Sequence, residues 1–229
     1  MSDTRSKLTR RGVLGLGLAA PAALVLTPLQ AAAERCGLTP AQTTGPFFPL
    51  WDQVDKDVDL TRLTGHGRAA RGLVIRVEGR VLDEACRPVE GALVDLWQTD
   101  SNGRYSHPDD PNPARRDPNF QGWGQATTDA QGRYAFRTIK PAAYPLEFLA
   151  SGEADAESGW RTPHIHFRVS KAGYRALATQ MYFAGEALNG PDIVLNAVPE
   201  AERAKVVRSA VERPDSPPTY PFDLTIARA

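Results

Sequence analysis

The feature that most constrains the fold is a series of short segments in which apolar and polar residues alternate, separated by clusters of turn-forming residues. Alternation with a period of two is typical of a strand that buries one face. Strands are predicted over 74–82, 92–97, 164–170, 178–183 and 222–226. Residues 127–136 are predicted to form a turn followed by a further strand. Short strands at such intervals indicate an all-β chain folded as a β-sandwich.

Helical patterns are rare in the chain. Residues 199–211 form its one convincing helix pattern, and the polar segments 100–124 and 145–160 are too long to be simple turns. Loops of that length are usually functional. We therefore expect a sandwich with long loops around a site and one or two short helices.

The N-terminus has the pattern of an export signal. Arg10 and Arg11 precede an apolar run over 12–29, and alanines at 31–33 form a small-residue cleavage site. Paired arginines at this place are typical of the twin-arginine pathway. A membrane anchor is the alternative, but Pro21 and Pro28 interrupt the run. We expect residues 1–33 to be a signal peptide and 34–229 to be one domain, periplasmic or secreted, with no membrane span after processing.

The overall charge gives no reason to expect nucleic acid as a partner. Basic and acidic residues number 27 each, and the pI is about 6.9. A basic surface for nucleic acid or acidic lipid would require an excess of Lys and Arg. An oxidising compartment would allow Cys36 and Cys86 to pair. Two free thiols are an equal alternative, because the sequence does not give their separation.

Two of the four histidines stand in the H-x-H pair His164 and His166. In a strand, side chains two residues apart leave the backbone on the same face, so both imidazoles could share one metal ion. The alternative is a pair of polar residues on the wet face of a sheet. The H-x-H pattern alone does not distinguish these readings.

Two tyrosines, Tyr105 and Tyr144, each lie in a turn that follows a predicted strand. Taken singly, each is better explained as a structural residue at a sheet edge. Together with His164 and His166 they form a set of phenolate and imidazole donors. A hard, oxidised ion such as Fe(III) favours anionic oxygen beside nitrogen, and a cation lowers the pKa of a bound phenol. Zn(II) more often recruits Cys or carboxylate with His.

Ordered sequence blocks over most of the predicted mature chain resemble the intradiol ring-cleaving dioxygenases, and within that family the iron-binding (beta) subunits of the protocatechuate 3,4-dioxygenase branch. The blocks are QTTGPFFP at 42–49, DLWQ at 95–98 with NGRY at 102–105, KPAAYP at 140–145, WRTPHIHF at 160–167, TQMYFAG at 179–185 and YPFDL at 220–224. The resemblance implies a prealbumin-like sandwich core and a non-haem Fe(III) centre.

The resemblance assigns roles to six positions. Tyr105 and His164 match equatorial iron ligands, and Tyr144 and His166 match the axial pair. Arg161 matches an arginine that steadies charge on the substrate ring, and Gln180 matches a glutamine of the same pocket. Of these, Tyr144, Arg161 and Gln180 are implied to act on the substrate.

The implied reaction joins O2 to a catechol-type substrate and opens the ring between its two hydroxyl-bearing carbons, giving a cis,cis-muconate-type diacid. Protocatechuate, converted to 3-carboxymuconate, is the expected substrate. A homo-oligomer or a related second subunit is the implied partner. His66 and His107 are not expected to bind iron.

The sequence also departs from this branch. Leu146 stands where the protocatechuate enzymes have a tryptophan, and the following segment carries four acids, Glu147, Glu153, Asp155 and Glu157. Catechol or hydroxyquinol is therefore an alternative substrate. Two other readings are a prealbumin-like module that only binds, and a zinc hydrolase using the histidine pair with Asp95 or Asp100. Neither explains the tyrosines.

Overall fold

The computed structural model describes residues 36–50, 52–53, 55–146 and 159–229, all within a compact unit that spans Ala33–Ala229. The predicted signal peptide and the four acids from Glu147 to Glu157 lie outside the described residues. None of the helices in the described ranges has the length and hydrophobicity that crossing a membrane requires.

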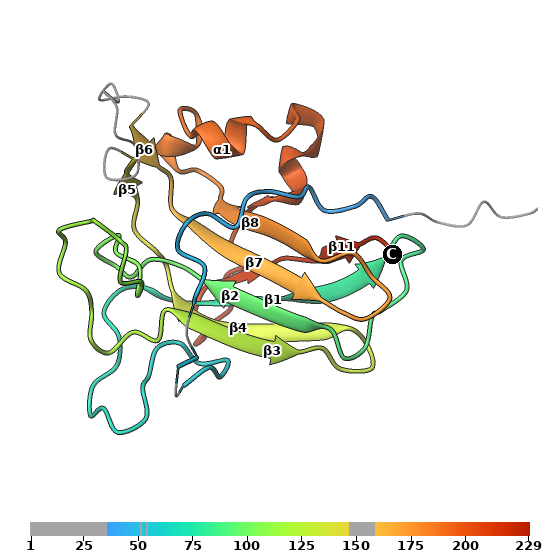
Figure 1. The fold of residues 1–229 in the computed structure, drawn as a ribbon. Helices are drawn as coiled ribbons and strands as arrows, with labels where there is room; N and C mark the ends of the chain where they lie inside the picture. The colour runs from blue at the N-terminus through green and yellow to red at the C-terminus, as the bar shows by residue number, and fades with distance from the viewer. Residues whose placement is uncertain (1–35, 51, 54, 147–158) are drawn as a thin grey trace, which may run out of the picture. The chain divides into compact units, whose positions relative to one another are not determined.

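Two larger sheets make up the fold (Figure 1). One has five strands in the order β3-β2-β7-β8-β9, and the other joins β4 and β1 to β10 and β11, which pair in succession along β1. The strands are β1 Val74–Asp83, β2 Leu93–Trp97, β3 Trp123–Thr127, β4 Arg133–Ile139, β7 His164–Ser170, β8 Leu177–Phe183, β9 Val207–Arg208, β10 Thr219–Pro221 and β11 Leu224–Ile226. A third, two-stranded sheet pairs β5 Tyr144–Pro145 with β6 Trp160–Arg161.

The hydrophobic core lies between the two larger sheets, because both contribute buried side chains to one cluster. On β7, Ile165, Phe167 and Val169 are fully buried in this cluster. His164 and His166 therefore leave β7 on the opposite, outer face of the five-stranded sheet. The prediction of an all-β sandwich is confirmed.

The predicted helix over 199–211 is wrong. Glu200–Lys205 is a short 3-10 helix (η3), and Val207–Arg208 is the strand β9, parallel to β8. The apolar positions that suggested a helix include Val206, which packs in a small cluster with Tyr182, Leu195 and Val198. Two other short helices, η2 Ala187–Asn189 and α1 Ile193–Asn196, were not predicted.

The predicted loop 100–124 also needs correction, because its last residues belong to strand β3. This strand contains Gly124, where an added Cβ would lie 2.6 Å from the carbonyl oxygen of Asp57. The strand, with the sequence WGQAT, also has no run of β-branched residues that would identify it in the sequence.

Cys36 and Cys86 form a disulfide, so the alternative of two free thiols is wrong. From this bridge, residues 36–48 form an N-terminal strap. Thr39 N–H donates to Thr225 O at 3.1 Å, and Gln42 N–H donates to Ala178 O at 2.8 Å. The strap thus crosses from β11 to β8 and leads toward the histidine pair.

Candidate functional site

Three side-chain atoms of the predicted metal site lie in mutual contact on the outer face of the five-stranded sheet. Tyr105 Oη lies 3.3 Å from His164 Nε2 and 3.0 Å from His166 Nε2, and the two Nε2 atoms are 3.2 Å apart. All three side chains are buried. Atoms at these separations can share one ion, because first-row metals bind imidazole nitrogen at about 2.0–2.1 Å.

The protonation states of the histidines also fit a cation. Burial, followed by the charge of Arg161, lowers the pKa of both imidazoles well below the usual value, so both are neutral. His164 Nδ1 lies 2.6 Å from Thr162 O, which can only accept, so Nδ1 carries the proton. The lone pair of His164 Nε2 then faces His166 Nε2. A backbone carbonyl that fixes the tautomer in this way is typical of a metal-bound histidine.

Tyr144 completes the group of predicted ligands. Its ring centroid lies 5.6 Å from that of Tyr105 and 5.7 Å from that of His164. Burial raises the pKa of both phenols. A phenolate here therefore requires a nearby cation. The structure brings all four predicted donors together, and their binding of a metal stays a prediction.

The loop that carries Tyr105 is held by its own side chains. The Asp100 carboxylate accepts from the N–H groups of Asn102, Arg104 and Asp117 at 2.8, 3.2 and 2.7 Å. Tyr105 N–H donates to Asp110 Oδ2 at 2.6 Å. The phenol is thus positioned by a rigid turn rather than by a strand.

Gly103 allows this turn to approach Tyr144. Its φ is +77°, and an added Cβ would lie 2.6 Å from Ala143 O and 3.4 Å from the Cβ of Tyr144. Any other residue would push the two tyrosine-bearing turns apart.

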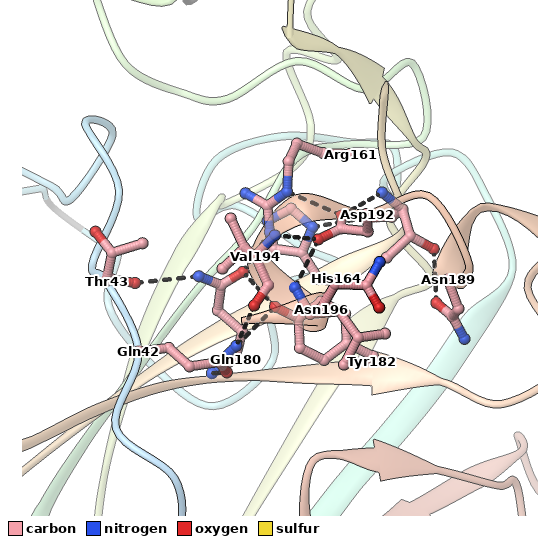
Figure 2. A network of polar contacts seen from close by, with 12 residues as sticks. Gln42, Thr43, Arg161, His164, Gln180, Tyr182, Asn189, Asp192, Val194 and Asn196 are labelled. Atoms are coloured by element: carbon pink, nitrogen blue, oxygen red, sulfur yellow. Dashed lines mark hydrogen bonds and ion pairs between the residues drawn. The ribbon is translucent and has the colours of Figure 1, made fainter. Parts of the chain in front are cut away.

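Arg161 lies beside this donor group and is 4% exposed. Its Nε donates to Asp192 Oδ2 at 2.9 Å and its Nη2 donates to Gln180 Oε1 at 2.6 Å (Figure 2). Burial lowers the pKa of the guanidinium, but the charges of Tyr144 and Asp192 outweigh burial and raise the pKa above its ordinary value. Arg161 is therefore a fixed positive charge.

Asp192 is a site residue that the sequence did not predict. Its carboxylate is fully buried, and Oδ2 accepts from Thr162 N–H as well as from Arg161. Its other oxygen, Oδ1, accepts from the N–H groups of Val194 and Leu195 and so caps helix α1. Asp192 lies 31 residues from Arg161 in the sequence, so no local pattern connects them.

Gln180 connects Arg161 to the N-terminal strap. Its Nε2 donates to Thr43 O at 3.1 Å, and its backbone N–H donates to Gln42 Oε1 at 2.9 Å. The Tyr182 hydroxyl, also not predicted, donates to Gln180 Oε1 at 3.1 Å and accepts from Gln42 Nε2 at 2.9 Å (Figure 2). The strap therefore fixes the amide that contacts the guanidinium.

Aromatic rings cover the donor group. Trp97 stacks on His166 with centroids 4.8 Å apart and an interplanar angle of 12°. From the strap, Phe47 lies 4.9 Å from Tyr105 and Phe48 lies edge-on to Trp97 at 4.9 Å. These rings exclude water from the imidazoles, which accounts for their lowered pKa.

The zinc-hydrolase reading lacks its carboxylate. Asp95 accepts hydrogen bonds from Trp123 Nε1 and Gln125 Nε2, and Asp100 is occupied by backbone N–H groups. Among the residues that the structure describes, no group of three or more His, Cys, Asp or Glu could hold a metal ion. Within the described ranges, Tyr105 and Tyr144 are the donors that lie beside the histidine pair.

The two other histidines lie outside the three-atom contact. His66 is exposed, with Nδ1 3.3 Å from Asn119 Oδ1. His107 is buried, not exposed as a polar loop would suggest, and its ring lies 5.6 Å from Phe47.

Comparison with known proteins shows that the chain is similar to dioxygenases. A family model described as "Dioxygenase" matches residues 43–227. The chain is 40% identical over 163 residues to the protocatechuate 3,4-dioxygenase beta chain of Burkholderia cepacia, covering 71% of this chain and 66% of that one. It is 32% identical over 213 residues to catechol 1,2-dioxygenase 2 of Acinetobacter lwoffii, covering 86% of this chain and 72% of that one.

Among solved structures, the fold is similar to 3-chlorocatechol 1,2-dioxygenase from Rhodococcus opacus 1CP. The TM-score is 0.64 at 25% identity, covering 83% of this chain and 73% of that one. The chain spans 66% of the length of the Burkholderia relative, so that relative contains residues with no counterpart in the match.

Proposed function

The chain belongs to the intradiol ring-cleaving dioxygenase family, and from this premise we propose that it binds Fe(III) and uses O2 to open a catechol-type ring between its two hydroxyl-bearing carbons. The observation that carries the proposal is the buried contact of Tyr105 Oη with two neutral imidazole nitrogens. That donor set suits a hard, oxidised ion. Among the described residues, no cluster of three or more His, Cys, Asp or Glu offers a different metal site.

The residues that would hold the iron are Tyr105, Tyr144, His164 and His166. When bound, the ion supplies the charge that stabilises phenolate and catecholate oxygens and makes the chelated ring reactive toward O2. Both atoms of O2 end in the carboxylates of the diacid, so the reaction needs no external reductant.

Tyr144 is proposed to take up a substrate proton at its Oη. Burial raises the pKa of this phenol, so Tyr144 Oη would hold a proton whenever it is not paired with a cation. A catechol has two such protons to release on binding. Tyr144 stands on β5, paired with Arg161 on β6, and therefore faces the same space as the guanidinium.

Arg161 is proposed to stabilise negative charge that builds on the ring carbons. Its guanidinium cannot lose its proton, and Asp192 and Gln180 fix it on two sides before substrate arrives. A charge donor that is already oriented stabilises a transition state without the cost of reorganisation. Asp192 and Gln180 are positioning residues in this scheme.

Protocatechuate is our proposed substrate, supported by the similarity to the Burkholderia beta chain and by the shared sequence blocks. Catechol and hydroxyquinol are the competing substrates, since relatives named for each are also similar to this chain. Leu146 counts against protocatechuate, because the protocatechuate enzymes have a tryptophan at this position.

Partners and location are further proposals. A relative named as the alpha chain of protocatechuate 3,4-dioxygenase is 33% identical over 198 residues, which supports a related second subunit or a homo-oligomer. Export through the twin-arginine pathway would place the Cys36–Cys86 bridge in an oxidising compartment.

The test is oxygen uptake by iron-loaded protein with protocatechuate, catechol and hydroxyquinol, with each product identified by mass. We expect a muconate-type diacid from at least one substrate and the highest kcat/KM for protocatechuate. A 2-hydroxymuconic semialdehyde would overturn intradiol cleavage, because that product arises from cleavage beside the diol. A higher kcat/KM for catechol or hydroxyquinol would overturn only the substrate assignment.

A further inference from the structure

Four arginines line one pocket outside the site described above. The pocket is a cavity of about 220 Å³. Its lining includes Arg68 and Arg71, which precede β1, Arg115 and Arg116, which follow Tyr105 in the same loop, and also Asn102 and Asp117. All four arginines are exposed. Within the described ranges, none of them forms an ion pair.

The one acid in the lining, Asp117, can offset only one of the four positive charges. Asp117 is buried, and its Oδ2 accepts from Arg71 N–H at 2.7 Å while its Oδ1 accepts from Asn119 N–H at 3.0 Å. The carboxylate thus uses both oxygens to join the two chain segments through their backbones. It links the backbones of the two arginine-bearing segments and forms no ion pair with their guanidinium groups.

The pocket is also held in place by other contacts. Asn102 Nδ2 donates to Arg115 O at 2.7 Å, and Arg116 Nη1 donates to Ser106 Oγ at 3.1 Å. Asp117 N–H donates to Asp100 Oδ2, the carboxylate that also caps the Tyr105 turn. These hydrogen bonds therefore hold in place the backbone that carries Arg115 and Arg116.

Like charges around one cavity repel one another, and an anion bound in the cavity would relieve this repulsion. Guanidinium groups match the geometry of phosphate and sulfate, which each offer several acceptor oxygens. We propose that this arginine pocket binds a small oxyanion of the phosphate or sulfate class. The proposal does not depend on the iron site or on the reaction.

The test measures binding to the full chain by calorimetry and by melting temperature, with sodium phosphate and sodium sulfate as ligands. Sodium chloride at equal ionic strength is the reference for general screening. We expect phosphate and sulfate to raise the melting temperature beyond chloride and to saturate. If the melting temperature in phosphate and in sulfate equals that in chloride at every concentration, the proposal is overturned.

The variants are Arg68→Gln, Arg115→Gln and their double, with Arg62→Gln as an exposed arginine that does not line the pocket. Losing one charged hydrogen-bond donor should weaken oxyanion binding by about tenfold. Without oxyanion and at low salt, the pocket variants should melt at or above the wild-type temperature, because repulsion is relieved. Equal oxyanion binding by wild type and by either single variant would contradict the assignment, and the singles decide the matter if the double fails to fold.

Two sources of the oxyanion are separated by comparing inorganic phosphate with glycerol 3-phosphate. Tighter binding of the free ion identifies an inorganic ligand, and tighter binding of the ester identifies the terminal phosphate of a larger molecule. If neither phosphate ligand binds and citrate does, the pocket selects carboxylates, and the proposal of a phosphate or sulfate ligand is overturned.

Discussion

Arg161 Nε donates a hydrogen bond to Asp192 Oδ2 at 2.9 Å, and both side chains are almost fully buried. The same carboxylate accepts from Thr162 N–H, two residues before His164, and caps α1 through its other oxygen. One buried group therefore links the guanidinium, the start of the histidine strand and a helix. Changing it alters the position of Arg161 without touching a donor of the predicted iron site.

Replacing Asp192 by Asn should lower stability and turnover while the iron remains. The change leaves Arg161 buried without its counter-charge, and breaking a buried pair typically costs about 3–5 kcal/mol in the free energy of unfolding. Denaturant titration measures this loss, and metal analysis measures iron per chain. The matched control is Asp109→Asn, since that side chain is 78% exposed and should change stability little. Equal stability of the two variants would show that the Asp192 contact is unimportant.

Replacing Arg161 by Ala should retain iron and lower kcat by about 100-fold to 1000-fold, the usual effect of removing one oriented charge donor. Because the variant also leaves Asp192 unpaired, stopped-flow turnover is compared with that of the double variant Arg161→Ala/Asp192→Asn. The double should recover stability but not rate. Recovery of rate in the double would assign Arg161 a structural role only.

His164→Ala and His166→Ala should each lose most bound iron, because a site with four protein donors that loses an imidazole keeps too few ligands. His66→Ala is the exposed control, and His107→Ala should also retain iron although its ring packs on Phe47. Iron per chain after reconstitution is the measurement. The wild type should absorb visible light through its tyrosinate donors, as the family resemblance implies. Equal iron in all four variants would remove the histidine pair from the site.

The sequence was sufficient to place the histidine pair, since the period of two along 164–170 separates His164 and His166 from the apolar Ile165, Phe167 and Val169. It was not sufficient to find Asp192, which follows Pro191 in an irregular segment and caps a helix of only four residues. Its contact with Arg161 is tertiary. A four-residue helix has no apolar period by which a sequence could reveal it.

The wrong helix prediction over 199–211 has the same physical origin. Val206 and Val207 follow a helical turn with the spacing of an amphipathic helix, but Tyr182 N–H donates to Val206 O at 2.8 Å. Pairing with β8 therefore determined the backbone there. Tertiary hydrogen bonds overrode a local preference worth only fractions of a kcal/mol per residue.

A second buried carboxylate, Asp83 at the end of β1, should control stability in acid. Its Oδ2 accepts from Arg87 Nε and Nη2 at 3.0 and 2.7 Å and from Arg228 Nη2 at 3.2 Å. Burial raises the pKa of Asp83, but the hydrogen bonds from Arg87 and Arg228 outweigh burial and hold it well below the usual range. The ionised form is therefore favoured in the folded chain more than in the unfolded one.

A depressed pKa in the folded chain contributes stability that is fully present above the unfolded pKa of about 3.9 and is lost as pH falls below it. We expect the melting temperature of wild type to fall between about pH 5 and the acid limit of folding, and the curve for Asp83→Asn to be lower and flatter in that window. Melting curves at half-unit pH steps measure both. Asp52→Asn, whose side chain is 77% exposed, serves as the control and should follow the wild type. Parallel curves for wild type and Asp83→Asn would show that another carboxylate governs the acid transition.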